Sequence, residues 1–171
     1  LNILYNESSI NQSDSLLETL NSIKEEIESL EAFNITHLGS QAYESTETNH
    51  TNVNSLLNHI PLLKSYLIHW SLLVFTNNSA DFAMVENYLD LVLSQDYFKY
   101  LLNFEYLSQY VCILFLISKN SKYKNRVNEL SSNFPNVPSC QLINSIYGDS
   151  DIEEIITLKN DVSSFVSNDF F

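Results

Sequence analysis

The chain of 171 residues contains only two glycines, Gly39 and Gly148, and only three prolines. Sandwiches, barrels and doubly wound sheets place glycine and proline at many turns, whereas helices joined by short loops need few of either residue. Phosphate-binding loops of the GxGxxG and GxxxxGKS/T types are excluded, because each needs closely spaced glycines. The scarcity of both residues therefore predicts an all-α protein and excludes most nucleotide-binding enzymes.

The charge balance is strongly acidic. Eight Lys and Arg residues stand against 21 Asp and Glu residues, which gives a formal net charge of −13. Such a charge repels the phosphates of nucleic acids. We therefore expect no DNA partner and no broad RNA-binding surface.

Three features bear on the compartment. Cys112 and Cys140 form neither a disulfide framework nor a zinc-binding spacing, which indicates a reducing, cytoplasmic environment. The longest apolar run, residues 111–117, is much shorter than the roughly 20 residues that span a bilayer, so we expect no membrane partner. The chain begins with Leu1 and carries no secretion signal, so we expect a piece of a longer protein.

Apolar residues recur at helical spacing along most of the chain. Residues 14–33 combine a capping box, Ser15 with Glu18, and an apolar stripe: Leu16, Leu20, Ile23, Ile27 and Leu30. A second helix is expected to begin near Pro61. Its predicted core stripe is Leu63, Tyr66, Leu67, Trp70 and Val74, widened by Leu62, Ile68 and Leu73, with Tyr66, Trp70 and Leu73 in the core.

Five further helical segments follow. They are residues 83–93, 107–117, 119–133 and 140–147, and a last helix opened by a capping box at Ser150 and Glu153 and ending near residue 166. Phe82, Val85, Tyr88 and Val92 are candidate core positions. Residues 107–117 are apolar almost all round, which predicts neighbours on two sides. Gly148 is expected to end its helix in the left-handed conformation.

We expect residues 1–13 to be a frayed N-terminal segment and residues 14–171 to form one helical-repeat domain. A polar stretch at about residues 34–54 has no apolar period and is predicted to be a mobile loop. Six or seven helices of these lengths indicate antiparallel helix pairs stacked as a helical-repeat array. A compact helical bundle is the alternative, since no repeated sequence signature is present.

The residue patterns predict no catalysis, metal site or cofactor. The histidines lack metal-ligand spacing: His37, His50, His59 and His69. The segment from Gly148 resembles a calcium loop, but Glu154 and Asn160 occupy positions that need Gly and Glu. The serines lack a GxSxG motif. We therefore expect a protein that is not an enzyme.

Half of the basic residues lie within eight positions: Lys119, Lys122, Lys124 and Arg126. On a continuous helix Lys119, Lys122 and Arg126 would share one face. Two interpretations stay open for this basic run. It is either a solvated helix start or a contact site for RNA or an acidic partner.

Two short motifs resemble one protein family. Residues 67–75, LIHWSLLVF, closely resemble a helix of the e subunit of eukaryotic translation initiation factor three, where the family reads LIHWSL, one further apolar residue, and VF. Residues 168–171, NDFF, match the family's Asn-Asp-Phe-Phe motif. Between them the match is looser: an apolar helix end at residues 88–93, a turn at 95–97 and the basic run follow in the family's order. The resemblance covers roughly residues 14–171.

The resemblance implies the helical-repeat part of a PCI protein, without the winged-helix module that follows the NDFF motif in the family. It implies a scaffold without enzymatic activity, which joins other initiation factor subunits and helps to place them on the small ribosomal subunit. A subunit of the proteasome lid or the signalosome, which share the PCI architecture, is the alternative. A helical enzyme or lipid carrier would instead need a deep apolar cavity.

Aromatic residues crowd the end of the chain, where Phe165, Phe170 and Phe171 follow one another closely. The resemblance implies that further helices cover this end in the longer protein. We therefore expect an apolar interface, through which the chain self-associates or onto which its own tail folds. A disordered tail is the alternative.

Overall fold

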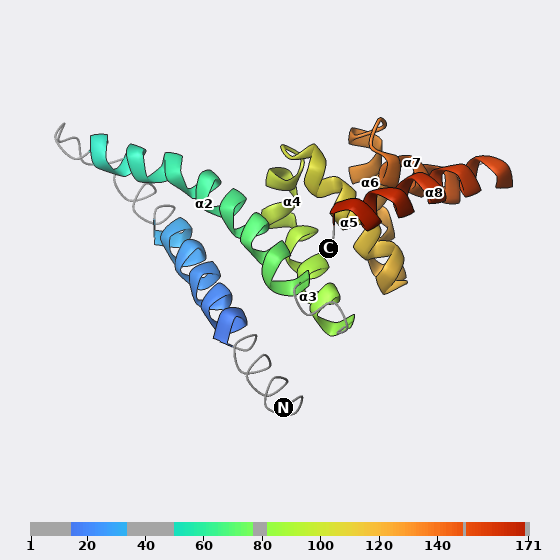
Figure 1. Ribbon diagram of the computed structural model, residues 1–171. Coiled ribbons are helices and arrows are strands. Elements are labelled where there is room, and N and C mark those ends of the chain that lie inside the picture. The colour runs from blue at the N-terminus through green and yellow to red at the C-terminus, as the bar shows by residue number, and fades with distance from the viewer. Residues whose placement is uncertain (1–14, 34–49, 77–81, 149, 170–171) are drawn as a thin grey trace, which may run out of the picture. The chain divides into compact units, whose positions relative to one another are not determined.

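The structure is a computed structural model that describes residues 15–33, 50–76, 82–148 and 150–169 (Figure 1). Within these ranges every regular element is a helix, which confirms the all-α prediction. The chain divides into two compact units, Leu1–Ala80 and Asp81–Phe171, each of which we describe by itself. The segment 1–13, expected to fray, lies outside the described residues.

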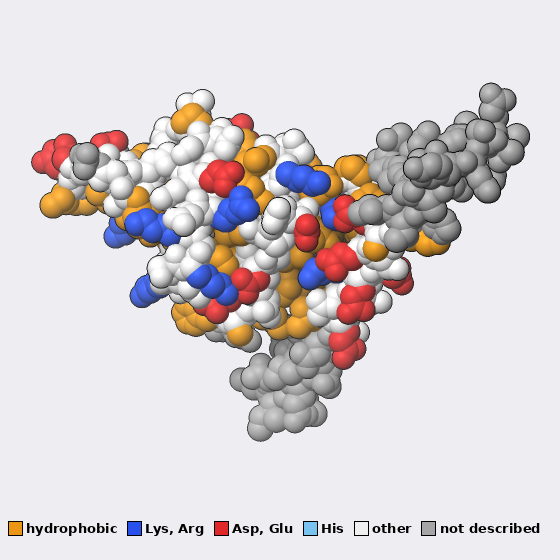
Figure 2. Space-filling model, turned by 180° about the vertical axis from the view of Figure 1, so that it is seen from behind, with side chains coloured by type: hydrophobic (Ala, Val, Ile, Leu, Met, Phe, Trp, Pro, Cys, Tyr) orange, Lys and Arg blue, Asp and Glu red, His pale blue; other side chains and the backbone are white. Residues whose placement is uncertain are grey.

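Unit 1 contains two described helices, one over residues 15–33 and α2 over His50–Thr76, which run in opposite directions (Figure 1). The first helix has nearly its predicted bounds. Acidic side chains are exposed along it (Figure 2). An ion pair between the buried Lys64 of α2 and Glu31 joins the two helices.

The predicted stripe of the first helix is only partly buried. Leu20 and Ile27 are enclosed, whereas Leu16, Ile23 and Leu30 are exposed. The exposed three repeat every seven residues and form one row along the helix, whereas Leu20 and Ile27 form the next row, so one neighbouring helix covers only the second row. The stripe prediction is therefore wrong for these three residues.

The prediction that the second helix begins near Pro61 is wrong, because α2 begins at His50 and Pro61 lies inside it. The Asn and Thr residues before Pro61 each disfavour a helix by less than about 1 kcal/mol, and tertiary packing routinely overrides such preferences. Residues 50–54 of the predicted polar loop are therefore helical. Residues 34–49 lie outside the described part of the chain.

The predicted core face of α2 is mostly wrong, although Leu67 and Ile68 are buried as predicted. Tyr66, Trp70 and Leu73 are exposed by 54%, 64% and 62%, respectively, and Leu63 is exposed as well. The buried side consists of Ile60, Lys64, Leu67, Ile68, Ser71, Leu72 and Phe75. Apolar residues occupy most of the circumference of α2, so spacing alone does not select the buried side. Pairing with Glu31 places the lysine inside, and the bulkiest aromatic residues face outward.

Unit 2 contains six α-helices and one 3₁₀ helix within its described residues. They are α3 (Phe82–Val92), α4 (Gln95–Leu101), α5 (Glu105–Ser118), η1 (Ser121–Tyr123), α6 (Lys124–Asn133), α7 (Pro138–Tyr147) and α8 (Ile152–Asp169). The apolar α5 contacts α3, α6 and α7, which confirms the predicted neighbours on more than one side. Val85, Tyr88 and Val92 of α3 are buried as predicted. Phe82 is exposed, because it occupies the first position of α3, before its buried stripe begins.

Three helix ends in unit 2 differ from the predictions. The predicted helix over 119–133 is divided, because Lys119 ends α5 in the left-handed conformation with φ of 54°. Gly148 has φ of −101° and is not left-handed. A Cβ atom on Gly148 would lie 2.7 Å from the carbonyl oxygen of Asn144, so close backbone approach explains the glycine. Asp151, not Ser150, caps α8, because its Oδ1 accepts the N–H of Glu154 at 2.8 Å.

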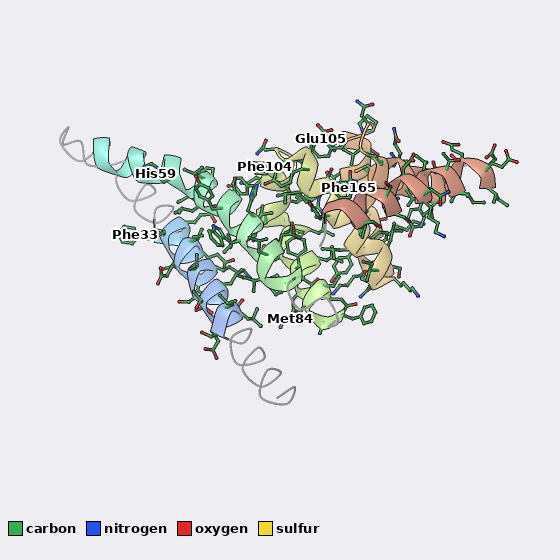
Figure 3. The ribbon with its side chains drawn as sticks, viewed as in Figure 1. Phe33, His59, Met84, Phe104, Glu105 and Phe165 are labelled. Atoms are coloured by element: carbon green, nitrogen blue, oxygen red, sulfur yellow. The ribbon has the colours of Figure 1, made fainter. Side chains whose placement is uncertain are left out.

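The aromatic end of the chain is described as far as α8. Phe165 of α8 is half-buried, and its ring meets that of Tyr110 edge to face at a centroid distance of 5.7 Å (Figure 3). It also packs against a core of Ile113, Leu142 and Val162. Phe165 therefore contributes to the contact of α8 with its own unit. Phe170 and Phe171 lie outside the described residues, so the interface expected there stays a prediction.

Candidate functional site

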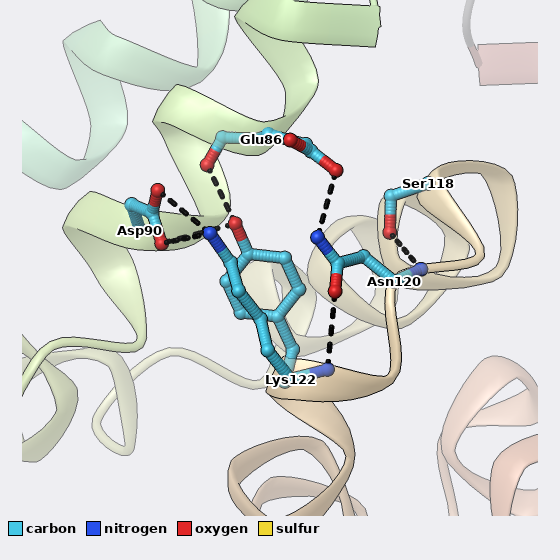
Figure 4. Close-up of polar contacts among 6 residues, drawn as sticks. Glu86, Asp90, Ser118, Asn120 and Lys122 are labelled. Carbon is cyan, nitrogen blue, oxygen red and sulfur yellow. Dashed lines mark hydrogen bonds and ion pairs between the residues drawn. The ribbon is translucent and has the colours of Figure 1, made fainter.

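A polar cluster links α3 to the start of the basic run (Figure 4) and consists of Glu86, Asp90, Ser118, Asn120, Lys122 and Tyr123. Lys122 Nζ lies 3.0 Å from Oδ1 and 3.1 Å from Oδ2 of Asp90. Asn120 Nδ2 donates to Glu86 Oε1 at 2.9 Å, and its Oδ1 accepts the backbone N–H of Lys122 at 3.1 Å. The Tyr123 hydroxyl lies 3.0 Å from both the Glu86 carbonyl oxygen and Asp90 Oδ1. The cluster therefore ties the η1 turn to α3.

The electrostatics of this cluster favour a charged lysine and a neutral phenol. Hydrogen bonds to Tyr123 and Asp90 raise the pKa of Lys122. Burial raises the pKa of Tyr123. The hydrogen bond from Lys122 lowers this pKa, and the hydrogen bond to Asp90 raises it further. Both members of the Lys122–Asp90 pair are about half exposed, so solvent screens their attraction.

Lys124 and Arg126 of the basic run also make contacts within unit 2. Lys124 Nζ lies 4.3 Å from the ring centroid of Tyr147, and Arg126 Cζ lies 4.9 Å from that of Phe98. Arg126 also pairs with Glu129 at 3.0 Å. The idea that Lys119 shares a helix face with Lys122 and Arg126 is wrong, because Lys119 terminates α5. A role of the basic run as a contact site for RNA or an acidic partner stays a prediction.

A buried thiol pair joins α5 to α7. The Sγ atoms of Cys112 and Cys140 lie 3.6 Å apart, and Cys140 Sγ also lies 3.6 Å from Ser108 Oγ. The hydrogen bond between the two thiols and burial raise the pKa of Cys112, whereas the same hydrogen bond lowers the pKa of Cys140. Both thiols are free and inaccessible, so this pair is part of the core of unit 2.

One side of α2 carries an exposed apolar surface that was not predicted from the sequence. Leu63, Tyr66, Trp70 and Leu73 lie within one side of the helix, and we call them the α2 face. The residue types could have indicated this surface, because Tyr and Trp are enriched at protein interfaces, where one end of the side chain is apolar and the other contacts water. The α2 face overlaps the segment 67–75 that carries the resemblance.

The described residues offer little else with the character of a site. Among them, no group of three or more His, Cys, Asp or Glu residues is placed to hold a metal ion. His59 is exposed, and His69 Nδ1 lies 2.7 Å from the Ser65 carbonyl oxygen. An open hollow of about 410 Å³ lies at the start of α5, around Phe104 and Glu105, and is lined by polar and apolar groups (Figure 3). No described helix is both long enough and apolar enough to cross a bilayer.

No protein family, curated protein or solved structure matches the chain. Function is therefore inferred from the surfaces described above and from the resemblance of residues 67–75 and 168–171.

Proposed function

We propose that this chain is a non-catalytic scaffold subunit of a translation initiation factor complex. It joins other subunits of the factor and helps to associate them with the small ribosomal subunit. The α2 face carries the proposal, because Trp70 and Leu73 are exposed within the segment that resembles the e subunit of eukaryotic translation initiation factor three. Large apolar side chains gathered on one exposed helix face are typical of protein-binding surfaces.

The proposal includes the architecture of the chain. In unit 2, α5 packs on α7, α6 packs on α7, and α7 packs on α8. These contacts join helices that are adjacent in the chain or separated by one helix, as in stacked helical repeats. We propose that the helices form antiparallel pairs of a PCI-type array without the winged helix, in a cytoplasmic protein.

Recovery of the bound proteins tests the function. The affinity-tagged chain is expressed in cells of its own source and purified under native conditions, and the co-purified proteins are identified by mass spectrometry. We expect initiation factor subunits and proteins of the small ribosomal subunit. Proteasome-lid or signalosome subunits in their place would select the alternative PCI complex, and recovery of none of these would contradict both.

A matched pair of variants assigns the contact to the α2 face. The double substitution Trp70→Ser and Leu73→Ser is expected to abolish recovery of the partners. The control, Phe82→Ser with Ile152→Ser, changes two exposed apolar residues of unit 2 and is expected to leave recovery unchanged. Circular dichroism of both variants shows whether they keep the helical fold. Equal losses in the two variants would contradict the assignment.

A further inference from the structure

Exposed apolar side chains occur on both helices of unit 1. On the helix over residues 15–33, Ile23 and Leu30 are exposed and seven residues apart, so they lie on nearly the same side. On α2, the α2 face provides two aromatic and two aliphatic side chains. A helix pair with such residues on each member has room for a third helix only if both sets look to the same side.

The Lys64–Glu31 ion pair shows which exposed residues of the two helices lie on the same side of the pair. It identifies the sides of the two helices that face each other. Leu63 precedes Lys64 by one residue and Leu30 precedes Glu31 by one residue, a rotation of about 100° in the same sense along each chain. Two antiparallel helices are related by a local twofold axis, so equal rotations from the pairing residues lead to the same side of the pair. Trp70, six residues after Lys64, lies on this side as well, whereas Leu73, nine residues after Lys64, points away from the paired helix. We call this surface the unit-1 strip: Ile23, Leu30, Leu63 and Trp70, with Tyr66 at its outer margin.

The acidic charge around the unit-1 strip favours a positively charged partner. The helix over 15–33 carries five glutamates and one lysine, Lys24. Glu26 lies three residues after Ile23 and four before Leu30, so its carboxylate borders the strip. Aromatic rings such as those of Tyr66 and Trp70 bind Lys and Arg through their faces. A second copy of the chain is disfavoured, because each copy has a net charge of −13.

We propose that the unit-1 strip binds a cationic amphipathic helix of a partner protein. The apolar side of that helix packs along the strip, and its Lys and Arg side chains meet Glu26 and the exposed rings. A helix fits because apolar residues at helical spacing on two antiparallel helices accept the side chains of a third. This inference deepens the proposed scaffold function and rests on it for treating the α2 face as a protein-binding surface.

Binding of a model peptide to the full chain tests the proposal. The probe is a synthetic helical peptide of leucine and lysine, with its leucines on one side. Trp70 is the only tryptophan of the chain, so its fluorescence reports directly on the strip. We expect saturable binding with a blue shift of Trp70 emission, because docking removes the ring from water.

Variants on both helices sharpen the test. Ile23→Ser and Leu63→Ser, one on each helix, are each expected to weaken binding at least tenfold. Glu26→Gln is expected to weaken binding severalfold and to reduce its salt dependence. Ile152→Ser and Ile156→Ser change exposed residues of α8 and are expected to leave the affinity unchanged.

Several outcomes would overturn the proposal. They are binding without a shift of Trp70 emission, equal losses in the α8 variants, and equal or tighter binding of a matched peptide of leucine and glutamate. A blue shift that grows with protein concentration without peptide would assign the strip to a second copy instead. The purified chain is used throughout, so peptide binding with no recovery of initiation factor subunits from cells would contradict the proposed function alone.

Discussion

Lys64 and Glu31 form an ion pair between the two helices of unit 1, although the lysine side chain is almost fully buried and that of Glu31 is 35% exposed. A buried ammonium group requires an opposite charge or other polar contacts, since its transfer from water is costly. The pair therefore explains how a charged residue occupies the buried side of α2. It also fixes which sides of the two helices meet.

Loss of the carboxylate is expected to cost more than loss of the pair. Glu31→Gln leaves the buried ammonium facing a neutral amide and should lower the free energy of unfolding by about 1 to 3 kcal/mol. The double variant Lys64→Met with Glu31→Gln removes both charges and keeps the apolar stem of the lysine, so its effect should be closer to neutral. Urea unfolding followed by circular dichroism measures both. Glu28→Gln is the control, because Glu28 is exposed and pairs with Lys24 on the same helix; an equal effect there would contradict a special role for Glu31.

Charge reversal at Lys122 is expected to destabilise unit 2. Lys122→Glu places a second carboxylate beside Asp90, where the lysine now lies 3.0 Å away, and like charges at this distance repel. Thermal unfolding followed by circular dichroism should show a lower midpoint, and the swap with Asp90→Lys should restore most of it. Lys159→Glu, an exposed residue of α8, makes the same change in net charge. If it lowers the midpoint equally, overall charge and not the pair is responsible.

The structural features that could be predicted from the sequence are those that depend on residues close together in the chain. Two glycines in 171 residues leave few folds besides a helical one. The segment around Val85, Tyr88 and Val92 has one clear apolar side and polar residues elsewhere, so its helix and its buried positions are both predictable. The apolar circumference of α5 likewise predicts its contacts with several helices.

The features that could not be predicted depend on residues far apart in the sequence. The buried side of α2 is decided by Glu31, which lies 33 residues before Lys64. The side chains of Asp90 and Lys122 meet across 32 residues, so composition shows the basic run but not its acidic partner. Spacing along one helix contains no information on such pairs.

Replacement of Lys119 by glycine is expected to stabilise unit 2. Lys119 has φ of 54° at the end of α5, a conformation that costs a residue with a Cβ atom about 1 to 2 kcal/mol. Glycine adopts it without that cost and is favoured after a helix C-terminus. Lys119→Gly should therefore raise the free energy of unfolding by up to about 1 kcal/mol in urea. Lys119→Ala removes the same charge but keeps Cβ, and a rise of equal size there would contradict the conformational explanation.

The two cysteines are expected to react slowly and in a fixed order. Cys112 and Cys140 are buried in the folded chain, so iodoacetamide should modify neither at the rate seen in the unfolded chain. Through fluctuations that admit the reagent but keep the Cys112–Cys140 hydrogen bond, Cys140 should react first, because that hydrogen bond lowers its pKa and the thiolate is the reactive form. Mass spectrometry of proteolytic peptides after timed labelling measures both rates. Modification of Cys112 first, or at an equal rate, would contradict this order.

Unit 2 is expected to lose stability above pH 10 through its buried phenols. Burial raises the pKa of Tyr88, which is fully enclosed in α3, and that of Tyr123. The phenol of an unfolded chain titrates near pH 10. Because the folded pKa is the higher one, the contribution is fully present below pH 10 and is lost as the pH rises from there toward the folded value. For Tyr88 the loss approaches about 1.4 kcal/mol per pH unit.

Urea unfolding between pH 8 and 11.5 measures this loss. The free energy of unfolding of Tyr88→Phe should run parallel to that of the wild type below about pH 9.5 and should fall less steeply above it. Absorbance at 295 nm of the wild type, compared with that of the variant, should show that the Tyr88 phenol ionises only as the protein unfolds. Equal slopes of the free energy of unfolding above pH 10 in the two proteins would contradict the role of Tyr88.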